Sequence, residues 1–443
     1  MAGRSARLVT VGGWGNWAGT ASCRPSSIVE PESDDELARA IAGAVARGER
    51  VKVAGTGHSF TDAACTDGMM IRSARLNRVL AVDRVARTVT VQPGATIRAL
   101  AERLAAEGLA FRNLGDIGAQ TIGGAIATAT HGTGARLGTL SSQVSAMTIM
   151  TAAGERIECS REHRPDVLAA ARVSLGALGA ATSVTIDCDE AYALHAVEEP
   201  MRLEWVLGSL DRYLDADDHF EFFWFPHTDR TLTKRNNRVD GPLRPRSRAK
   251  EWFDEMLLAN RAFGAVCRIG RARQTLIPPM ARMAGRMLSR VEYTDRSDRV
   301  FTSPRTVRFA EMEYAIPLAA AADAVRGVRA IIADRGYRIS FPVEVRFAAA
   351  DEDAHLSTSA GRATAYIAVH VFQGMPYEPF FREVEALMGR FEGRPHWGKI
   401  HFLDGDALAA RYPEWDAFAR IRARLDPDGV FRNAYLDRVL GVG

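Results

Sequence analysis

A short glycine-rich turn that ends in a histidine constrains the fold of this chain more than any other feature. Residues 51–60 read VKVAGTGHSF, so a β-type run enters a turn made of Gly55, Thr56 and Gly57. Glycines this close together let the backbone curl so that successive N–H groups point inward, which forms an anion-binding concavity. The turn then delivers His58, whose imidazole can act as a nucleophile or a ligand. One loop therefore combines phosphate capture with a reactive side chain.

A second glycine-rich stretch, residues 120–134 (QTIGGAIATATHGTG), follows further along the chain. Its small residues leave room for a flat ligand against the backbone, and its threonines supply hydroxyls for phosphate, ribityl or carbonyl oxygens. A buried helix with small-residue packing would explain the alanines, but it would not explain His131 followed by Gly-Thr-Gly. Neither stretch ends in the Gly-Lys-Ser/Thr of a P-loop. The two stretches together therefore indicate a flavin site.

These stretches and several later motifs resemble the vanillyl-alcohol-oxidase-like flavoproteins, which carry a PCMH-type FAD-binding domain. Within that group the chain is similar to the sugar-1,4-lactone branch, which comprises L-gulono-1,4-lactone and D-arabinono-1,4-lactone oxidases and dehydrogenases. Alditol oxidases are close relatives of this branch. The motifs that carry the resemblance span nearly the whole chain and are Asn16-Trp17-Ala18-Gly19, Gly57-His58-Ser59, residues 131–134 (HGTG), residues 174–179 (SLGALG), Glu344-Val345-Arg346, His396-Trp397-Gly398-Lys399 and residues 426–431 (DPDGVF).

The resemblance implies an α+β fold in three parts. A two-subdomain PCMH-type FAD-binding domain is expected over residues 1–190, and a substrate domain with a large antiparallel sheet covered by helices over 191–400. Residues 401–443 are expected to return to the flavin site. The residue pattern itself predicts strands at 51–53, 69–71, 80–82, 88–91, 146–151, 181–188, 220–225, 306–314, 340–347 and 364–372, and helices at 34–48, 97–108, 165–172, 252–273, 279–288, 318–335 and 378–389.

Composition narrows the class of protein without naming a function. A length of 443 residues exceeds what one hydrophobic core usually serves, so at least two domains are expected. The net charge of +3 gives no reason to expect a nucleic-acid partner, and the basic cluster at 244–248 is expected to be a solvated loop. Five scattered cysteines without a C-x-x-C pair favour reduced thiols and a cytoplasmic protein. No apolar run approaches the ~20 residues that span a bilayer, and the first residues lack a secretory signal. Peripheral membrane contact is left open.

Glu344 and Arg346 are the first candidate catalytic residues. They lie two positions apart in the β-type run 343–347 (VEVRF), so on a strand both side chains point to the same face. An exposed ion pair at a sheet edge is one interpretation. The run is apolar enough to be a central strand, however, and a charged pair there must be paired or face a polar cavity. The resemblance favours the cavity, because the family carries its active-site glutamate and arginine in this Glu-x-Arg motif.

Three further candidates follow from the resemblance. Lys399 would sit beside flavin and substrate, His370 aligns with a substrate-contacting histidine of alditol oxidases, and Thr121 falls where that branch has a serine. A hydrogen-bonded sheet histidine is an equal alternative for His370. The implied reaction transfers a hydride from a secondary carbinol C–H to flavin N5, with Arg346 and Lys399 stabilising the reduced ring. Glu344 would orient the substrate hydroxyls, and either Glu344 or Lys399 would take the hydroxyl proton.

The resemblance also implies FAD as the cofactor, bound covalently through His58, and no metal. The expected cofactor-binding residues are Ala54, Gly55, Thr56, Gly57, His58, Ser59, Asp116, Gln120, Thr121, Gly124, Ala125, Thr128, His131, Gly132, Gly134, Val184 and Asn433. The expected substrate is a sugar-1,4-lactone, with L-gulono-, L-galactono- and D-arabinono-1,4-lactone as candidates. Electrons would pass to O2 or to another acceptor, a redox protein or a quinone.

Three alternatives remain at this point. An alditol oxidase acting on open-chain polyols shares most of the motifs. A degenerate member that binds flavin without turnover is a second alternative, although the joint presence of Glu344, Arg346 and Lys399 argues against it. A nicotinamide enzyme is the weakest alternative, because Gly132-Thr-Gly134 is followed by Gly138 and misses the G-x-G-x-x-G spacing by one residue.

Overall fold

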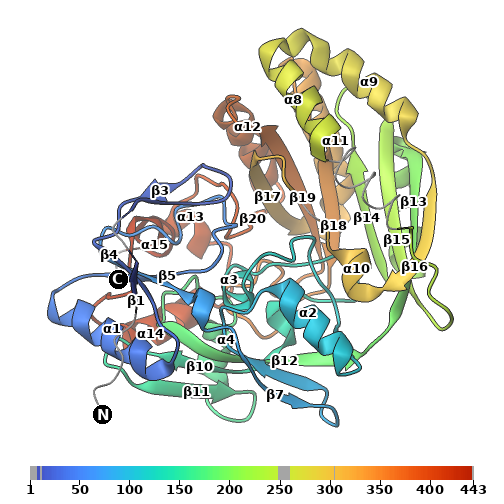
Figure 1. The fold of residues 1–443 in the computed structure, drawn as a ribbon. Coiled ribbons are helices and arrows are strands. Elements are labelled where there is room, and N and C mark those ends of the chain that lie inside the picture. Colours follow the sequence, from blue (N-terminus) through green and yellow to red (C-terminus); the bar gives the residue numbers. More distant parts are fainter. Residues whose placement is uncertain (1–6, 10–11, 248–259, 304, 442–443) are drawn as a thin grey trace.

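The N-terminal part of the chain is built on a small, mostly parallel sheet (Figure 1). The computed structural model describes residues 7–9, 12–247, 260–303 and 305–441. The sheet has the order β1 (Arg7–Val9), β4 (Ser27–Glu30), β6 (Met69–Arg72), β5 (Val51–Ala54), and helix α1 (Asp34–Ala46) crosses from β4 to the parallel strand β5. Ser33 caps α1 by accepting a hydrogen bond from the Glu36 N–H. Strands β2 (Trp14–Gly15) and β3 (Ser22–Cys23) pair beside this unit.

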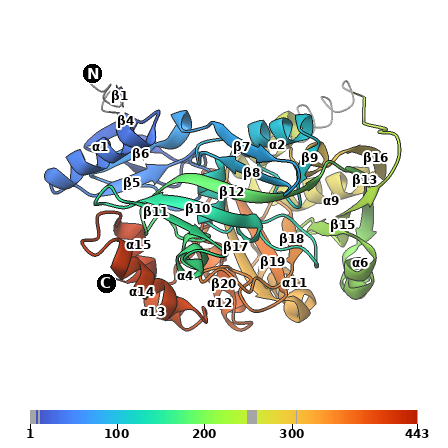
Figure 2. The same ribbon diagram turned by 90° about the horizontal axis from the view of Figure 1, so that it is seen from below.

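A six-stranded antiparallel sheet forms the second unit, which Figure 2 shows from below. Its order is β11 (Arg156–Ser160), β10 (Val144–Met150), β12 (Ala180–Glu190), β8 (Thr88–Val91), β7 (Val79–Asp83), and β9 (Leu109–Phe111) pairs with the end of β12. Helices α2 (Ile97–Ala106), α3 (Ile122–Ala127) and α4 (Pro165–Ala171) contribute buried side chains to the core of this unit. The C-terminal helices α13 (Gly405–Ala409), α14 (Trp415–Leu425) and α15 (Ala434–Leu440) return to the same core.

The third unit is an eight-stranded antiparallel sheet. Its order is β16 (Val291–Arg296), β13 (Ala193–Arg202), β15 (Arg230–Val239), β14 (His219–Trp224), β18 (Val343–Ala348), β19 (Thr364–Phe372), β17 (Phe309–Pro317), β20 (Arg394–Pro395). Helices α5 (Leu203–Leu207), α6 (Leu210–Ala216), α11 (Ala321–Asp334) and α12 (Glu378–Gly389) cover one face and share its core. Helices α8 (Phe263–Ala272), α9 (Ile277–Met287) and α10 (Ser297–Phe301) complete the unit (Figure 1).

The two faces of this eight-stranded sheet differ in chemistry because side chains alternate along each strand. Val343, Val345 and Phe347 of β18 lie in the core beneath the helices. Glu344 and Arg346 therefore point to the opposite face, which turns toward the N-terminal half. The sequence prediction that this pair sits on a central strand is confirmed, since β18 pairs with β14 on one side and β19 on the other.

Most predicted elements are present with small shifts of their bounds. The expected strand at 306–314 is β17 at Phe309–Pro317, and strands β13, β15 and β16 were not predicted. The predicted helix at 252–273 is present as α8 from Phe263 onward, and its first residues, like Arg248 of the basic cluster, lie outside the described residues. All five cysteines are free thiols, as expected. Within the described ranges, no helix is both long enough and apolar enough to cross a membrane.

The two glycine-rich stretches approach each other, and a neighbouring loop, too closely for side chains at some positions. A Cβ on Gly55 would overlap the Oγ1 of Thr121, and a Cβ on Gly132 would overlap the Leu114 carbonyl oxygen and the Asn113 side chain. Gly57 has φ +73°, a left-handed conformation that favours glycine. These glycines are therefore required by the approach of one loop to another.

Replacement of Gly132 by alanine is expected to lower the free energy of unfolding by about 1–3 kcal/mol, because a backbone carbonyl cannot rotate away from the new methyl group. Gly389→Ala is the matched control, since a Cβ there meets no atom within 4 Å. We expect the control to change the unfolding free energy by less than about 1 kcal/mol. Equal destabilisation of both variants in urea unfolding would contradict the proposed loop contact.

Candidate active site

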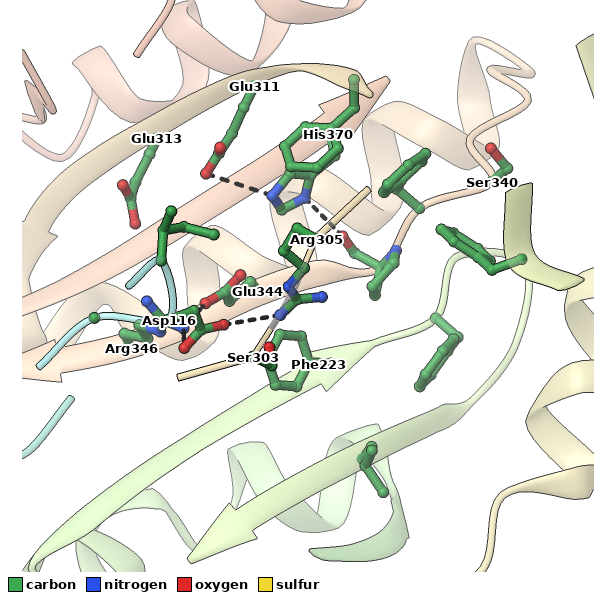
Figure 3. Close-up of a pocket in the computed structure, with 18 of the residues that line it drawn as sticks. Asp116, Phe223, Ser303, Arg305, Glu311, Glu313, Ser340, Glu344, Arg346 and His370 are labelled. Carbon is green, nitrogen blue, oxygen red and sulfur yellow. Dashed lines mark hydrogen bonds and ion pairs between the residues drawn. The ribbon is translucent and has the colours of Figure 1, made fainter. Parts of the chain in front are cut away.

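A cavity of about 1080 Å³ lies between the charged face of the eight-stranded sheet and the glycine-rich loops. Figure 3 shows side chains of β17, β18 and β19 pointing into it, together with residues from connecting loops. Predicted site residues that line the cavity are His58, Ser59, Asp116, Gln120, Thr128, His131, Glu344, Arg346, His370 and Lys399. Segments far apart in the sequence therefore meet at one hollow.

The guanidinium of Arg346 is the most heavily paired group of the cavity. It forms ion pairs with Asp116 at 2.5 Å, Glu344 at 2.5 Å and Glu221 at 2.7 Å. Asp116 also pairs with Arg305 at 2.8 Å. Burial alone would raise the pKa of Asp116, but Arg346 and Arg305 outweigh it and lower that pKa. Asp116, a predicted cofactor-binding residue, lines the cavity, and its carboxylate is engaged by these two arginines.

Strand register creates a second charged group. Glu311 and His370 are direct partners across β17 and β19, and the His370 Nε2 lies 3.4 Å from a Glu311 oxygen. The other ring nitrogen lies 3.0 Å from the Pro342 carbonyl oxygen, which can only accept, so Nδ1 carries a hydrogen. Lys399 forms an ion pair with Glu311 at 2.5 Å, and its Nζ lies 4.9 Å from the centre of the Phe60 ring. Glu311 thus joins two of the predicted catalytic residues.

A third group contains His131, Glu313 and His396, all buried. The His131 Nε2 lies 3.2 Å from Glu313, its Nδ1 donates to the Gly132 carbonyl, and its ring stacks on Tyr366. Among the residues that the structure describes, this trio alone has donor atoms spaced closely enough to hold a metal ion. One nitrogen of His396 already accepts from the Gly398 N–H, and burial lowers the pKa of His396 to about 3. The His131–Glu313 pair and the bonds to Gly132 and Gly398 therefore account for these side chains, and we assign no metal to them.

Two carboxyl groups in this cavity are held in different protonation states. Burial raises the pKa of Glu344 to about 7, although Arg346 opposes the shift. Burial acts in the same direction on Glu311, but Lys399 and His370 outweigh it and lower the pKa of Glu311 to about 2. Near neutral pH Glu311 is therefore a fixed carboxylate, whereas the Glu344 carboxyl can exchange a proton, as general acid–base chemistry requires.

The loop that carries His58 is fixed by the Asn16-Trp17 motif and by the segment around Lys399. The Trp17 N–H donates to the Gly57 carbonyl at 2.8 Å, and the Asn16 side chain donates to the Ser59 carbonyl at 2.9 Å. The Phe60 N–H donates to the Gly398 carbonyl at 2.7 Å. Burial, with Lys399 adding to it, lowers the pKa of His58, so its imidazole is neutral at the cavity wall.

The cavity wall fits a polar, flat cofactor. The Thr130 hydroxyl is buried at this wall and has no hydrogen-bond partner within the described residues. Buried polar groups are nearly always paired, so a ligand that accepts from Thr130 would complete the site. Gly115, Gly118 and Ala119 add little side-chain bulk to the same wall.

Other predicted cofactor residues lie outside the lining of this cavity; they are Ala54, Gly55, Thr56, Gly57, Thr121, Gly124, Ala125, Gly132, Gly134, Val184 and Asn433. Thr121 precedes α3 and faces Gly55, and Val184 is buried in β12. The Asn433 side chain donates to three carbonyl oxygens, those of Asp62, Ala63 and Cys65. Asn433 of the C-terminal segment therefore contacts the backbone of the loop that follows His58.

Sequence reasoning missed Glu221, Glu311 and Glu313. Each is a charged residue inside an otherwise apolar strand, and all three are buried. The same signal had identified Glu344 and Arg346. Glu311 and Glu313 lie two positions apart in β17. Because side chains alternate along a strand, this spacing could have placed both on the charged face of the sheet.

Comparisons with known proteins agree with this arrangement. The family model described as "FAD binding domain" matches residues 25–160. The family model described as "D-arabinono-1,4-lactone oxidase" matches residues 184–439, more than half of the chain.

Two curated relatives align with nearly the whole chain. An L-gulono-1,4-lactone dehydrogenase of Mycobacterium tuberculosis (strain ATCC 25618 / H37Rv) is 46% identical over 97% of this chain and 99% of its own. An L-gulonolactone oxidase of Scyliorhinus torazame is 36% identical over 96% of this chain and 97% of its own. Among solved structures, a solvent-stable cholesterol oxidase superposes with a TM-score of 0.82 at 19% identity, covering 99% of this chain and 98% of its own. At that identity the similarity establishes the fold alone, which is the expected PCMH-type fold.

The raised pKa of Glu344 predicts a pH-dependent effect on stability. The folded protein keeps this proton between pH 4.5, the ordinary pKa, and about 7, whereas the unfolded chain loses it. The Glu344 contribution therefore lowers the free energy of unfolding as the pH rises through this window. Glu344→Gln removes this pH-dependent contribution. The free energy of unfolding of the variant, measured relative to that of the parent, should therefore rise by about 1–3 kcal/mol from about pH 5 to about pH 8.

Glu311→Gln is the matched control for this experiment. The pKa of Glu311 is lowered to about 2, so its contribution is complete above about pH 4.5 and is lost only in more acidic solution. Urea unfolding over the same pH range should show a constant difference between this variant and the parent. A Glu344→Gln difference that is equally flat would show that Glu344 is ionised throughout.

Proposed function

Because the chain belongs to the D-arabinono-1,4-lactone oxidase family, we propose that this FAD-dependent oxidoreductase oxidises a CH–OH group of a sugar-1,4-lactone. L-gulono-1,4-lactone is the first candidate, since the relatives at 46% and 36% identity are named for it. L-galactono- and D-arabinono-1,4-lactone are the next candidates. The observation that carries the proposal is the pair Glu344 and Arg346 on a central strand, facing the cavity that Lys399 also lines.

The domain boundaries that we propose follow the boundaries of the sheets. We propose an FAD-binding domain over residues 1–190, a substrate domain over 191–400 and a C-terminal segment over 401–443. In support, β1–β12 form sheets separate from the eight-stranded sheet, whose first strand in the chain begins at Ala193. His58, Ser59, Gln120, Thr128, Thr130 and His131 would contact FAD from the first domain, and Glu311, Glu344, Arg346, His370 and Lys399 would face it from the second.

Bound FAD supplies the acceptor for the hydride that leaves the substrate carbon. Glu344 is our proposed base for the substrate hydroxyl, since its carboxyl is poised near neutral pH while Arg346 holds it in place. Lys399 is the weaker candidate for the base, because its ammonium is already engaged by the fixed carboxylate of Glu311. Lys399 and Arg346 instead place positive charge where negative charge develops. The Nδ1–H of His370 is bonded to a backbone carbonyl, which fixes the ring. The ring and its neighbour Glu311 would together orient a substrate oxygen.

Thr121 receives a supporting role in this proposal. Its hydroxyl faces Gly55, so we assign it to the contact between the two glycine-rich loops. The same holds for Asn433, which satisfies three carbonyls of the segment after His58.

The test is anaerobic reduction of the bound flavin by L-gulono-, L-galactono- and D-arabinono-1,4-lactone, with xylitol as the open-chain comparison. We expect one lactone to bleach the flavin absorbance rapidly and xylitol to do so far more slowly. Admission of air, or of a quinone in place of air, then reports the acceptor from the rate of reoxidation. Faster reduction by xylitol than by every lactone would assign the chain to polyol oxidation, and no reduction by any of them would indicate a protein without turnover.

Lys399→Met is the informative variant in the same assay. We expect it to retain FAD but to reduce it at least about 100-fold more slowly, since lost stabilisation of developing charge typically costs a few kcal/mol. Arg390→Met removes an exposed cation at the end of α12 and is the matched control. An unchanged rate in Lys399→Met would exclude a role of this lysine in the reaction.

We further propose that FAD is attached covalently to a ring nitrogen of His58. The supporting observations are the position of His58 at the cavity wall and the lowered pKa that keeps its imidazole neutral and nucleophilic. After acid precipitation, the pellet should be yellow and its tryptic flavopeptide should contain His58. His58→Ala should release FAD into the supernatant. Quantitative release of flavin from the parent protein would refute the covalent bond and leave the FAD assignment intact.

A further inference from the structure

Glu221 lies behind Arg346 in the eight-stranded sheet. It is 3% exposed, and the described residues that line the cavity include Arg346 and Lys234 but not Glu221. The Nε–H of Arg346 donates to one carboxylate oxygen of Glu221 at 2.7 Å, and the Lys234 ammonium pairs with the other at 3.0 Å. Glu221 therefore reaches the cavity through two cations that line it.

The hydrogen-bond ladder of the sheet places these three side chains in one row. Glu221 of β14 lies directly opposite Lys234 of β15. On its other side, β14 pairs Phe222 with Val345 of β18. The next pair in this register is Glu221 with Arg346. Directly opposite residues have their Cβ atoms about 5 Å apart, so the backbone itself brings the carboxylate of Glu221 between the two cations.

All three groups of this row are charged at neutral pH. Burial alone would raise the pKa of Glu221, but Lys234 and Arg346 outweigh it and lower that pKa. Burial would lower the pKa of Lys234, but Glu221 outweighs it and raises that pKa. Glu221 is therefore a fixed carboxylate between two fixed cations.

The bond to Nε orients the rest of the Arg346 guanidinium. This group is planar and rigid, so a partner on Nε determines the direction in which the other two nitrogens point. One of them, Nη2, lies 2.5 Å from Glu344 and 2.5 Å from Asp116. Figure 3 shows these three side chains gathered at one side of the cavity. Glu221 thus helps to determine where Arg346 meets Glu344.

Glu221 also acts on Glu344 through its charge. Burial raises the pKa of Glu344 to about 7, and the negative charges of Asp116 and Glu221 add to the rise, whereas Arg346 opposes it. The ionisable groups around Glu344 are Arg346 of the same strand, Asp116 and Arg305 of connecting segments, Glu221 of β14 and His370 of β19.

We propose that Glu221 is a positioning residue for the reaction, which holds the guanidinium of Arg346 against Glu344 and places a negative charge behind it. The proposal rests on the proposed function, in which Glu344 is the base and Arg346 a cation beside the flavin. Two substitutions separate charge from reach. Glu221→Gln keeps the size of the side chain and removes its charge, whereas Glu221→Asp keeps the charge on a side chain that is shorter by one methylene group.

The first test follows the proton of Glu344 in the FAD-loaded protein without substrate. The infrared C=O band of the protonated carboxyl is measured against pH and is identified by its loss in Glu344→Gln. We expect a midpoint near pH 7 in the parent and a midpoint lower by at least about 0.5 in Glu221→Gln, because a like charge has been removed. In Glu221→Asp the midpoint should stay within about 0.3 of the parent value.

Glu385→Gln is the matched control. Glu385 lies on α12, against the opposite face of the same sheet, where it accepts hydrogen bonds from the Tyr314 hydroxyl and the Phe402 N–H. This variant should leave the Glu344 midpoint unchanged. A parent-like midpoint in Glu221→Gln, or an equal shift in Glu385→Gln, would overturn the proposal.

The second test is anaerobic reduction of FAD by the lactone that reduces the parent. Both Glu221 variants should be reduced at least about tenfold more slowly, since small displacements of an orienting group are costly. In Glu221→Gln the acidic limb of the pH–rate profile should also move to lower pH. Glu385→Gln should keep the parent rate. Should Glu221→Gln fail to fold, Glu221→Asp decides, and a parent-like rate in it would exclude the positioning role.

The two tests separate failure of this proposal from failure of the proposed function. If no lactone reduces the parent, the proposed function is wrong, and the infrared midpoint still decides whether Glu221 controls the proton of Glu344. If a lactone reduces the parent while the midpoint of Glu221→Gln is parent-like, the role of Glu221 is refuted and the proposed function stands.

Discussion

The guanidinium of Arg346 joins the two halves of the molecule inside the site. Asp116 reaches it from the connection between β9 and α3, and Glu344 and Glu221 reach it from two strands of the eight-stranded sheet. A buried charge is tolerated only when it is paired, and removal of one partner of a buried pair commonly costs about 3–5 kcal/mol. Contact between the two halves of the molecule and the electrostatics of the site therefore depend on the same atoms, so a change to either one alters the other.

The register of the sheet determines which charges meet. Glu221 lies directly opposite Lys234, and Glu311 directly opposite His370, so both pairs follow from the hydrogen-bond ladder. A shift by one residue would turn every charged side chain into the core. The apolar residues on the other face prevent that shift, and packing of α11 and α12 thereby preserves the pairing at the cavity.

The apolar run around Glu344 and Arg346 indicated a central strand, and the motif resemblance favoured the cavity over an exposed ion pair at a sheet edge. The motif resemblance supplied Lys399 and His370, which lie together at Glu311 although 29 residues separate them. Strands β13, β15 and β16 carry many polar residues, since much of their length is half-buried or exposed, and their alternation was too weak to predict. The contact of Thr121 with Gly55 and the hydrogen bonds of Asn433 could not be predicted either. Each depends on a contact between distant loops, which no local pattern records.

The contacts of Asn433 bear on the order in which this protein can mature. Three carbonyl oxygens of the segment 62–65 are satisfied by an amide that lies up to 371 positions later in the chain. Since translation proceeds from the N-terminus, the segment that follows His58 waits for its partner until nearly all of the printed sequence has left the ribosome. The small parallel sheet can assemble early, but the loop that carries His58 gains its hydrogen bonds to Asn433 only late in synthesis. A product truncated before Asn433 would therefore leave these carbonyl oxygens without the amide that bonds them.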